Sequence, residues 1–387
     1  MTDAPTTEAP TEVAMIETPP DPPSPPSPPS PPKRDYSLTG ESTRWAIEAG
    51  LASADWYHSD VPRKTMKELM KRDDAPATRD TAIWLGLILA SAAGAILTWG
   101  TWWCVPFFAV YGVLYGSASD SRWHECGHGT AFKTPWKNNF VYQIASFMLM
   151  RNPVTWRWSH ARHHTDTIIV GRDAEIAVMR PPDLLKAALM FTGVLDFRYS
   201  LPTLFRNAFG NLSPDEKSFI PESEWPRAIT AARWHVAIYV VTILLALGLG
   251  SWLPILLIGT PRLYGSWHMI LTGLLQHIGL ADNVTDHRLN TRTVYMNPVS
   301  RFIYWNMNYH VEHHMFPMIP YHALPRLHAL IKDDLPEPNP SMWHAYREVW
   351  PVLLRQLRYE EHYLRRELPP SARPYREEFH QAIPAAE

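Results

Sequence analysis

Cysteine is nearly absent from this sequence. Only Cys104 and Cys126 occur among its 387 residues, which is too few for a disulfide framework, and no CxxC pair predicts a redox or zinc site. This low count suits a reducing compartment. An excess of one charge is lacking too, because the formal net charge is -2. Nothing in this balance predicts nucleic acid as a partner.

The sequence also has no glycine-rich nucleotide-binding loop, no haem-binding module and no rubredoxin-like cysteine pairs. An oxidoreductase built on this chain would therefore receive its electrons from a separate carrier. Residues 1–35 contain no apolar core, so we interpret them neither as a signal peptide nor as an anchor. Their repeated proline–serine pattern predicts a disordered, polyproline-II-like tail over residues 1–40.

Long uncharged apolar runs are present instead. The first, over residues 81–98, is just long enough to cross a hydrocarbon core of roughly 30 Å. Further runs cover about residues 103–118, 234–249 and 252–275, and tryptophans stand at the turn within each pair of runs. The sequence therefore predicts an all-α, integral-membrane fold with four transmembrane helices in two hairpins.

Two hairpins place both ends of the chain and the segment 120–230 on one side of the lipid bilayer. Lysine and arginine are concentrated in these parts, so the positive-inside tendency predicts that this side is the cytoplasm. We expect a cytoplasmic helical cap that holds the active site, on the inner (cytoplasmic) membrane. Residues 41–335 would form this membrane domain, and residues 336–387 an amphipathic C-terminal helix and tail.

Eighteen histidines are many for this length, and half of them fall in short motifs near predicted cytoplasmic helix ends. In HECGH, two histidines stand four residues apart, which places them on one helix face. HARHH and HVEHH each supply three histidines at i, i+3 and i+4, and QHIGL adds one after the fourth run. The candidate metal ligands are His124, His128, His160, His163, His164, His277, His310, His313 and His314.

Histidine is the only ligand type in this set. Imidazole suits iron, copper and zinc, and the absence of thiolates disfavours an iron–sulfur cluster. Nine ligands are too many for one ion, so two ions that share them, each with an open position for dioxygen, fit the count. Iron is preferred to zinc by elimination, because nine histidines have no evident purpose in hydrolysis. The other nine histidines are interpreted as structural or exposed, with a ligand role left open for His268.

Two functions of other classes compete with this interpretation. The five residues from His124 to His128 also satisfy HExxH, the pattern of zinc metalloproteases in which Glu125 would be the general base. A membrane zinc metalloprotease would leave both HxxHH motifs and His277 without a purpose. A membrane metal transporter would need polar groups within its spans, and these runs are almost free of them.

The histidine motifs resemble those of the membrane fatty acid desaturase family, which has HxxxH, HxxHH and HxxHH around two hairpins and a further histidine after the fourth span. The match covers roughly residues 80–330, and QHIGL also resembles a ligand segment of the related alkane hydroxylases. The resemblance implies a di-iron centre in which the nine histidines hold two Fe ions, with O2 as co-substrate.

The same resemblance implies a reaction. The sequence is similar to those of O2-dependent oxidoreductases of lipid metabolism, which implies that the protein desaturates a fatty acyl or lipid-like chain. The alternative within the family is a hydroxylase, or monooxygenase, that acts on an alkane or on a small amine or amino-acid-derived metabolite. Either reaction implies a ferredoxin- or rubredoxin-type electron carrier with an NAD(P)H reductase as partners.

Carboxylates normally orient metal-bound imidazoles, so acidic residues near the motifs are candidates for this role. Ordinary loop or surface charge is the alternative for each of them. The candidates are Glu125, Asp166, Asp173, Asp282 and Glu312. No catalytic side chain beyond the metal ligands is predicted.

Overall fold

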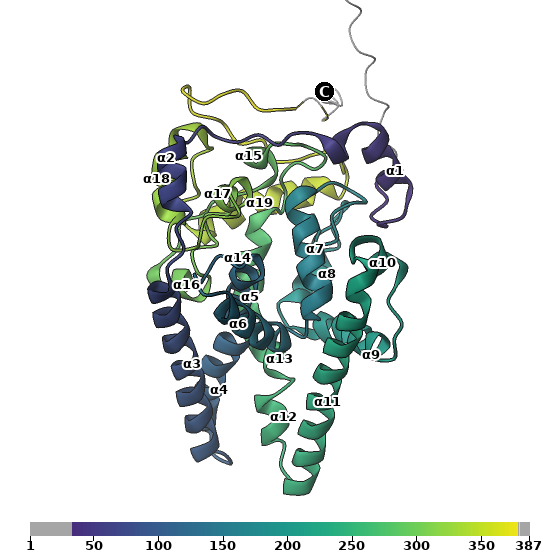
Figure 1. The fold of residues 1–387 in the computed structure, drawn as a ribbon, viewed down its shortest axis with the longest axis vertical. Coiled ribbons are helices and arrows are strands. Elements are labelled where there is room, and N and C mark those ends of the chain that lie inside the picture. Colours follow the sequence, from purple (N-terminus) through teal and green to yellow (C-terminus); the bar gives the residue numbers. More distant parts are fainter. Residues whose placement is uncertain (1–32, 378, 380–387) are drawn as a thin grey trace, which may run out of the picture.

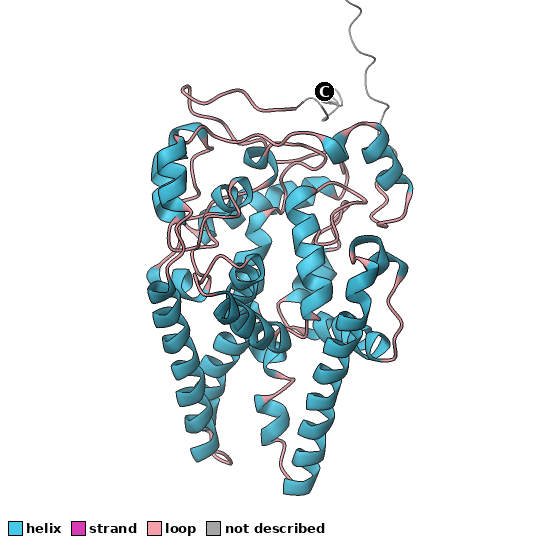
Figure 2. Cartoon of the chain, viewed as in Figure 1, coloured by secondary structure: helices cyan, strands magenta, loops and turns pink. Residues whose placement is uncertain are grey.

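The computed structural model describes residues 33–377 and residue 379. Helices and loops make up this described part, and no strand occurs within it beyond two isolated bridges, Thr293 with Tyr309 and Val294 with Asn339 (Figure 2). The predicted all-α class is therefore correct. Most of the proline-rich tail predicted over residues 1–40 lies outside the described residues.

Two pairs of elements project downward from a broad helical cap (Figure 1). One pair is α3 (Asp74–Leu97) with α4 (Cys104–Gly116), and the other is α11 (Trp225–Leu249) with α12 (Leu253–Leu257). The cap contains α5 (Ala118–His128), α6 (Pro135–Met148), α7 (Pro153–Thr165) and the later helices. This arrangement matches the two predicted hairpins in outline.

The first hairpin follows the prediction closely. The side chain of Asp73 accepts a hydrogen bond from the Ala75 amide and so caps the start of α3. After the turn, α4 is followed by α5, and the break between them lies at Ser117, whose hydroxyl donates to the carbonyl of Gly265 over 2.5 Å. The first histidine motif therefore starts directly above the hairpin.

The fourth predicted run, 252–275, is not one helix, and that prediction was wrong. The structure divides it into α12, α13 (Pro261–Gly265), α14 (Trp267–Gly273) and the 3-10 turn η4 (Leu274–Gln276). Gly259 has a φ of 96° and Pro261 has no amide hydrogen to continue a helix. At Gly265 a Cβ would lie 1.8 Å from the carbonyl oxygen of Gly112, so α13 packs directly on the α4 backbone.

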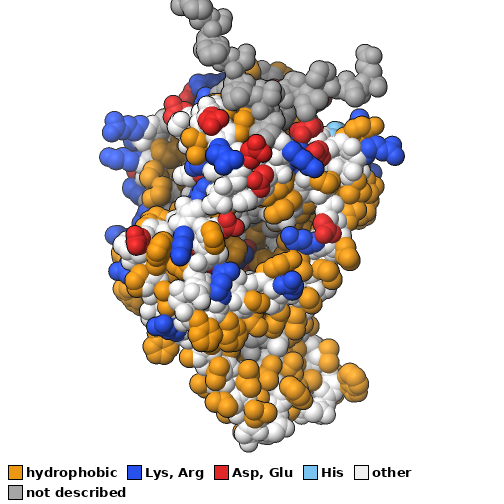
Figure 3. Space-filling view, turned by 90° about the vertical axis from the view of Figure 1, so that its right-hand side faces the viewer, with side chains coloured by type: hydrophobic (Ala, Val, Ile, Leu, Met, Phe, Trp, Pro, Cys, Tyr) orange, Lys and Arg blue, Asp and Glu red, His pale blue; other side chains and the backbone are white. Residues whose placement is uncertain are grey.

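Two helical stretches, Arg63–Leu97 and Glu222–Leu249, are long and apolar enough to cross a membrane by length and composition. In their most apolar windows only 33% and 28% of the residues are buried, so most of this apolar surface faces outward. Figure 3 shows the consequence from one side: charged side chains gather over the cap, while the projecting hairpin is covered by apolar side chains. The four-span topology stays a prediction.

The predicted C-terminal helix is present as α19 but ends at Gln356. The remaining elements of the cap are mostly short. Their bounds are α1 (Glu41–Glu48), η1 (Leu51–Ser53), α2 (Arg63–Leu69), α8 (Leu184–Met190), η2 (Asp196–Ser200), α9 (Leu201–Ala208), α10 (Pro214–Phe219), η3 (Glu222–Glu224), α15 (His287–Asn290), α16 (Pro298–Ile303), α17 (His310–Met315), α18 (Leu324–Ile331), η5 (Lys332–Asp334) and α19 (Met342–Gln356).

Candidate metal centre

Helix α5 carries the first histidine motif. His124 and His128 are one turn apart and lie on the same face of the helix. The helix ends at Gly129, whose φ of 70° is a conformation that glycine adopts without strain. His124 is buried and His128 is half-buried, so both rings enter the interior of the cap.

Helix α7 carries the second motif and divides it between two places. The side chain of Asn152 caps the helix by accepting hydrogen bonds from the amides of Val154 and Thr155. His160 and His164, four residues apart, point to the group that contains the α5 histidines. His163 is turned away from them by the helical rotation and points to a second group.

Helix α17 divides the third motif in the same manner. His313 joins the first group, whereas His310 and His314 join the second. His277, the residue after η4, completes the second group. The two i, i+3, i+4 motifs therefore each contribute to both groups, which holds the groups side by side.

The structure thus brings all nine predicted histidines together in two clusters. The first cluster contains His124, His128, His160, His164 and His313. The second cluster contains His163, His277, His310 and His314. Within each cluster the potential ligand nitrogens all lie within 4.8 Å of one another.

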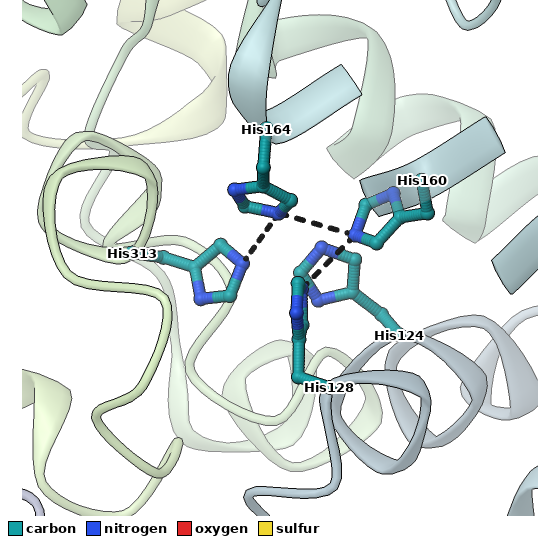
Figure 4. Close-up of side chains that lie close together, drawn as sticks. All are labelled: His124, His128, His160, His164 and His313. Atoms are coloured by element: carbon teal, nitrogen blue, oxygen red, sulfur yellow. Dashed lines mark hydrogen bonds between the residues drawn. The ribbon is translucent and has the colours of Figure 1, made fainter. Parts of the chain in front are cut away.

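The spacing of these nitrogens fits a metal ion. In the first cluster the Nε2 atom of His160 lies 3.1 Å from that of His128 and 3.2 Å from that of His164, and Figure 4 shows these rings converging from α5, α7 and α17. In the second cluster the Nε2 atoms of His310 and His314 are 3.1 Å apart. Two nitrogens at right angles around an ion, each about 2.1 Å from it, are separated by about 3 Å.

Burial keeps most of these imidazoles neutral, as metal ligation requires. It lowers the pKa of His128 to about 4 and that of His277 to about 3. His163 differs: burial lowers its pKa, but the charge and hydrogen bond of Asp173 outweigh burial and raise the pKa above the ordinary value.

Hydrogen bonds at the outer ring nitrogens orient several of the histidines. The Nδ1 atom of His163 lies 2.8 Å from Asp173, and that of His160 lies 3.0 Å from Glu175. The Nδ1 atom of His277 lies 2.8 Å from the carbonyl oxygen of Asn290. Such partners fix the ring orientation and the tautomer of a metal-binding imidazole.

Only one of the five predicted orienting carboxylates makes such a hydrogen bond, and it is Asp173. Glu125 approaches the Nδ1 atom of His313 only to 3.8 Å. The other three were wrong predictions because each is engaged elsewhere. Asp166 pairs with Arg172, Asp282 with Arg34 and Arg180, and Glu312 with His328 and Thr293.

Glu175 was missed because nothing in its local sequence marks it. It follows His160 by 15 residues and lies in a loop, so its approach depends on how the chain returns after α7. Its other oxygen accepts from the Ser159 hydroxyl over 2.9 Å. Burial raises the pKa of this carboxyl to about 7.

Two further buried histidines lie outside both clusters. His268 hydrogen-bonds through Nε2 to Ser300 over 3.1 Å, which supports its structural interpretation. His287 stacks on Trp56 at a centroid distance of 4.3 Å, and its ring lies 5.1 Å from that of His314. Sequence spacing gave no sign of this second contact.

Glu125, the central residue of the HExxH pattern, is held away from a general-base position. One of its oxygens accepts from the Tyr321 amide and from the Thr130 hydroxyl, each over 3.1 Å. Burial raises the pKa of this carboxyl to about 8. The HExxH histidines also share their cluster with three histidines from other motifs. This setting disfavours a zinc metalloprotease.

Fold and site together define a class: a helical protein with two adjoining clusters of histidines suited to a pair of metal ions. The family model for fatty acid desaturases matches residues 100–346, which is more than half of the chain. The chain therefore belongs to the fatty acid desaturase family. This membership supports the prediction of an oxidoreductase.

Curated relatives agree with this assignment at low identity. The chain is 23% identical over 259 residues to an endoplasmic-reticulum omega-3 fatty acid desaturase of Vigna radiata, covering 62% of this chain and 67% of the relative. It is 24% identical over 255 residues to the acyl-lipid omega-3 desaturase (cytochrome b5) of Arabidopsis thaliana, covering 61% and 65%. For the chloroplastic sn-2 acyl-lipid omega-3 desaturase (ferredoxin) of Helianthus annuus the identity is 24% over 283 residues, covering 68% and 62%.

Proposed function

We propose that this protein is a membrane di-iron oxidoreductase that uses O2 and external electrons to desaturate a fatty acyl or lipid-like chain. The observation that carries the proposal is the convergence of nine histidines from four segments into two adjoining clusters. Family membership and relatives named as acyl-lipid desaturases support the type of reaction.

The donor set fits two iron ions. Several inner nitrogens lack any hydrogen-bond partner among the described residues, among them both ring nitrogens of His124 and the Nε2 atom of His277. Buried polar atoms of this kind are costly unless a ligand engages them. Under the proposal the first cluster holds one ion through five imidazoles, and the second holds the other through four.

When bound, the iron pair would supply the redox chemistry of dioxygen. In the balanced reaction, a –CH2–CH2– unit, O2, two electrons and two protons give a –CH=CH– unit and two water molecules. The protein's own part is to keep the imidazoles neutral, to orient them through Asp173 and Glu175, and to bury the centre. Helices α5, α7 and α17 carry eight of the nine histidines, and six of the nine are buried, which limits the access of water.

The hairpins would anchor the protein in a bilayer, with the cap and its metal centre on the cytoplasmic side of the inner membrane. The outward-facing apolar windows of α3 and α11 support the bilayer anchor, and the proposed side rests on the positive-inside tendency of the sequence. The shorter partners α4 and α12–α14 would complete the predicted four-span anchor. An electron carrier of the ferredoxin or rubredoxin type with an NAD(P)H reductase would serve the centre, and the names of two relatives mention cytochrome b5 and ferredoxin.

Elemental analysis of the detergent-purified full-length protein tests the proposal. We expect about two iron ions per chain, and O2 consumption when the dithionite-reduced protein is mixed with dioxygen. Product analysis by mass spectrometry would then separate an alkene from an alcohol. One zinc and no iron would overturn the di-iron assignment and favour the HExxH hydrolase.

A further inference from the structure

A small cavity adjoins both histidine clusters. His124 and His160 of the first cluster and His277 and His310 of the second form part of its wall. Its volume is about 130 Å³, well below the roughly 300–1,000 Å³ of pockets that enclose drug-sized ligands. At about 10–15 Å³ for each water-sized group, it has room for roughly ten such groups. The cavity suits a compact molecule.

An ion pair faces this cavity beside the first cluster. Asp120 lies one helical turn before His124 on α5, and one of its oxygens accepts from Arg151 over 2.7 Å. The side chains of this pair are 17% and 16% exposed, and both residues line the cavity. The charges are thus accessible to a molecule inside the cavity.

The position of Arg151 is fixed while most of its donors are left open. Its guanidinium carbon lies 4.3 Å from the ring centroid of Trp123 and 4.4 Å from that of Trp156. Among the described residues, the hydrogen bond to Asp120 is the one that this guanidinium makes, although the group has five N–H donors. The second carboxylate oxygen of Asp120 likewise has no hydrogen-bond partner in the described part of the chain.

The other charged groups of the wall are already engaged. Glu175 accepts from Ser159 and contacts His160. Arg180 donates to the Leu280 carbonyl and pairs with Asp282, which also pairs with Arg34. The Asp120–Arg151 pair is therefore the part of the wall with both a free anionic acceptor and free cationic donors.

A larger apolar groove lies elsewhere and contains none of the nine clustered histidines. It has a volume of about 870 Å³ and is lined by residues of α6, α7 and α11, including Phe147, Trp234 and Ile238. An acyl chain has room in this groove. The space next to the candidate ligands, by contrast, is small and charged.

We propose that the cavity binds a compact zwitterion, in which an anionic group faces Arg151 and a cationic group faces Asp120, and that the carbon chain to be oxidised is short. A closely spaced pair of opposite charges is complementary to a solute with adjacent opposite charges. The inference rests on the O2-dependent di-iron part of the proposed function, and it replaces the long acyl chain as substrate by a short chain that bears its charged groups within a few carbons of the reacting bond.

The test measures binding by isothermal titration calorimetry with the full-length protein in detergent. The probes are L-norleucine, which has adjacent amine and carboxylate groups, and its singly charged or neutral analogues hexanoate, hexylamine and hexan-1-ol. We expect norleucine to bind at least tenfold more tightly than each analogue, because charged hydrogen bonds contribute most to recognition. A norleucine affinity no better than that of hexan-1-ol would overturn the proposal.

Variants then assign the binding to the ion pair. Asp120→Asn and Arg151→Gln should each weaken norleucine binding at least tenfold, with the iron content and thermal midpoint of the wild type. The matched control is Lys71→Gln, which removes the charge of an exposed ion pair with Glu68 and should leave binding unchanged. Wild-type norleucine affinity in both cavity variants would contradict the assignment.

The two proposals fail separately. A wild-type protein with its iron pair and O2 consumption but no norleucine binding would refute the zwitterion site alone. Saturable norleucine binding to a protein that never acquires iron would refute the di-iron function while the cavity assignment stands.

Discussion

The two histidine clusters differ in how their rings are held. In the second cluster three of four histidines have a partner at Nδ1: His163 has Asp173, His277 has the Asn290 carbonyl and His314 has the Thr167 hydroxyl. In the first cluster, among the described residues, only His160 has such a partner. The five-histidine cluster has more ligands but fewer hydrogen bonds at their Nδ1 atoms. The four-histidine cluster has fewer ligands and more such hydrogen bonds. The rings of the second cluster are thus the more firmly oriented ones.

Removing one ligand from each cluster should have the largest effect. We expect His164→Ala and His310→Ala to reduce turnover by more than the 10–100-fold typical of losing an outer-shell partner. His310→Ala leaves three imidazoles in its cluster and should lose that iron more completely than His164→Ala, which leaves four. Iron per chain and turnover check this.

His268→Ala is the matched control, because His268 is buried but lies outside both clusters. It should keep both irons. Wild-type turnover in either ligand variant would show that the assignment of that cluster is wrong.

A crowded backbone contact should affect the second cluster more than the first, although the contacted helix α4 leads into α5 of the first cluster. Gly265→Ala would bring a Cβ to 1.8 Å from the Gly112 carbonyl oxygen and displace the segment that leads to His277, at a cost of about 1–3 kcal/mol or more. The first cluster takes no ligand from this segment. We expect a lower thermal midpoint and loss of about half of the iron.

Gly248→Ala serves as the control for this variant, because a Cβ there meets nothing within 4 Å. It should match the wild type in iron content. Equal iron loss from both clusters in Gly265→Ala would break the proposed separation between them.

The outer carboxylates should have a smaller effect, and each should act on its own cluster. Asp173→Asn should weaken iron binding in the second cluster by about 10–100-fold, because it removes the carboxylate that orients His163. Glu175→Gln should have a weaker effect, confined to the first cluster. Release of iron to a chelator, followed over time, distinguishes the two. If both variants accelerate the release of iron from the same cluster, the carboxylates do not each act on their own cluster.

The smallest effect is expected from Thr167→Val, which removes the hydroxyl that lies 3.1 Å from the Nδ1 atom of His314. The loss of one neutral hydrogen bond, about 1 kcal/mol, should raise the iron dissociation constant of the second cluster by roughly fivefold. Thr155→Val is a suitable control, because the buried hydroxyl of Thr155 has no hydrogen-bond partner among the residues that the structure describes. Identical iron retention in the two valine variants would show that the Thr167 hydroxyl does not contribute to iron binding in the second cluster.

Helices with a simple pattern could be predicted from the sequence. The run 81–98 lies within α3 apart from its last residue, and the run 234–249 lies within α11, because an unbroken apolar segment has few alternatives to a helix. The run 252–275 has the same composition but contains Gly259, Pro261 and a tight contact at Gly265. Hydropathy alone does not register these local constraints, so the prediction there failed.

The sequence by itself determined which histidines share a helix face, because i, i+4 spacing fixes the directions of the pairs His124/His128, His160/His164 and His310/His314 before any tertiary contact forms. Only the tertiary structure decided how the nine histidines divide into five and four, since that depends on where α5, α7, α17 and the His277 segment meet. It also decided that Glu175 supports His160 and that Asp120 pairs with Arg151 beside the cavity. These contacts join residues 15 and 31 positions apart through loops whose course no local spacing prescribes.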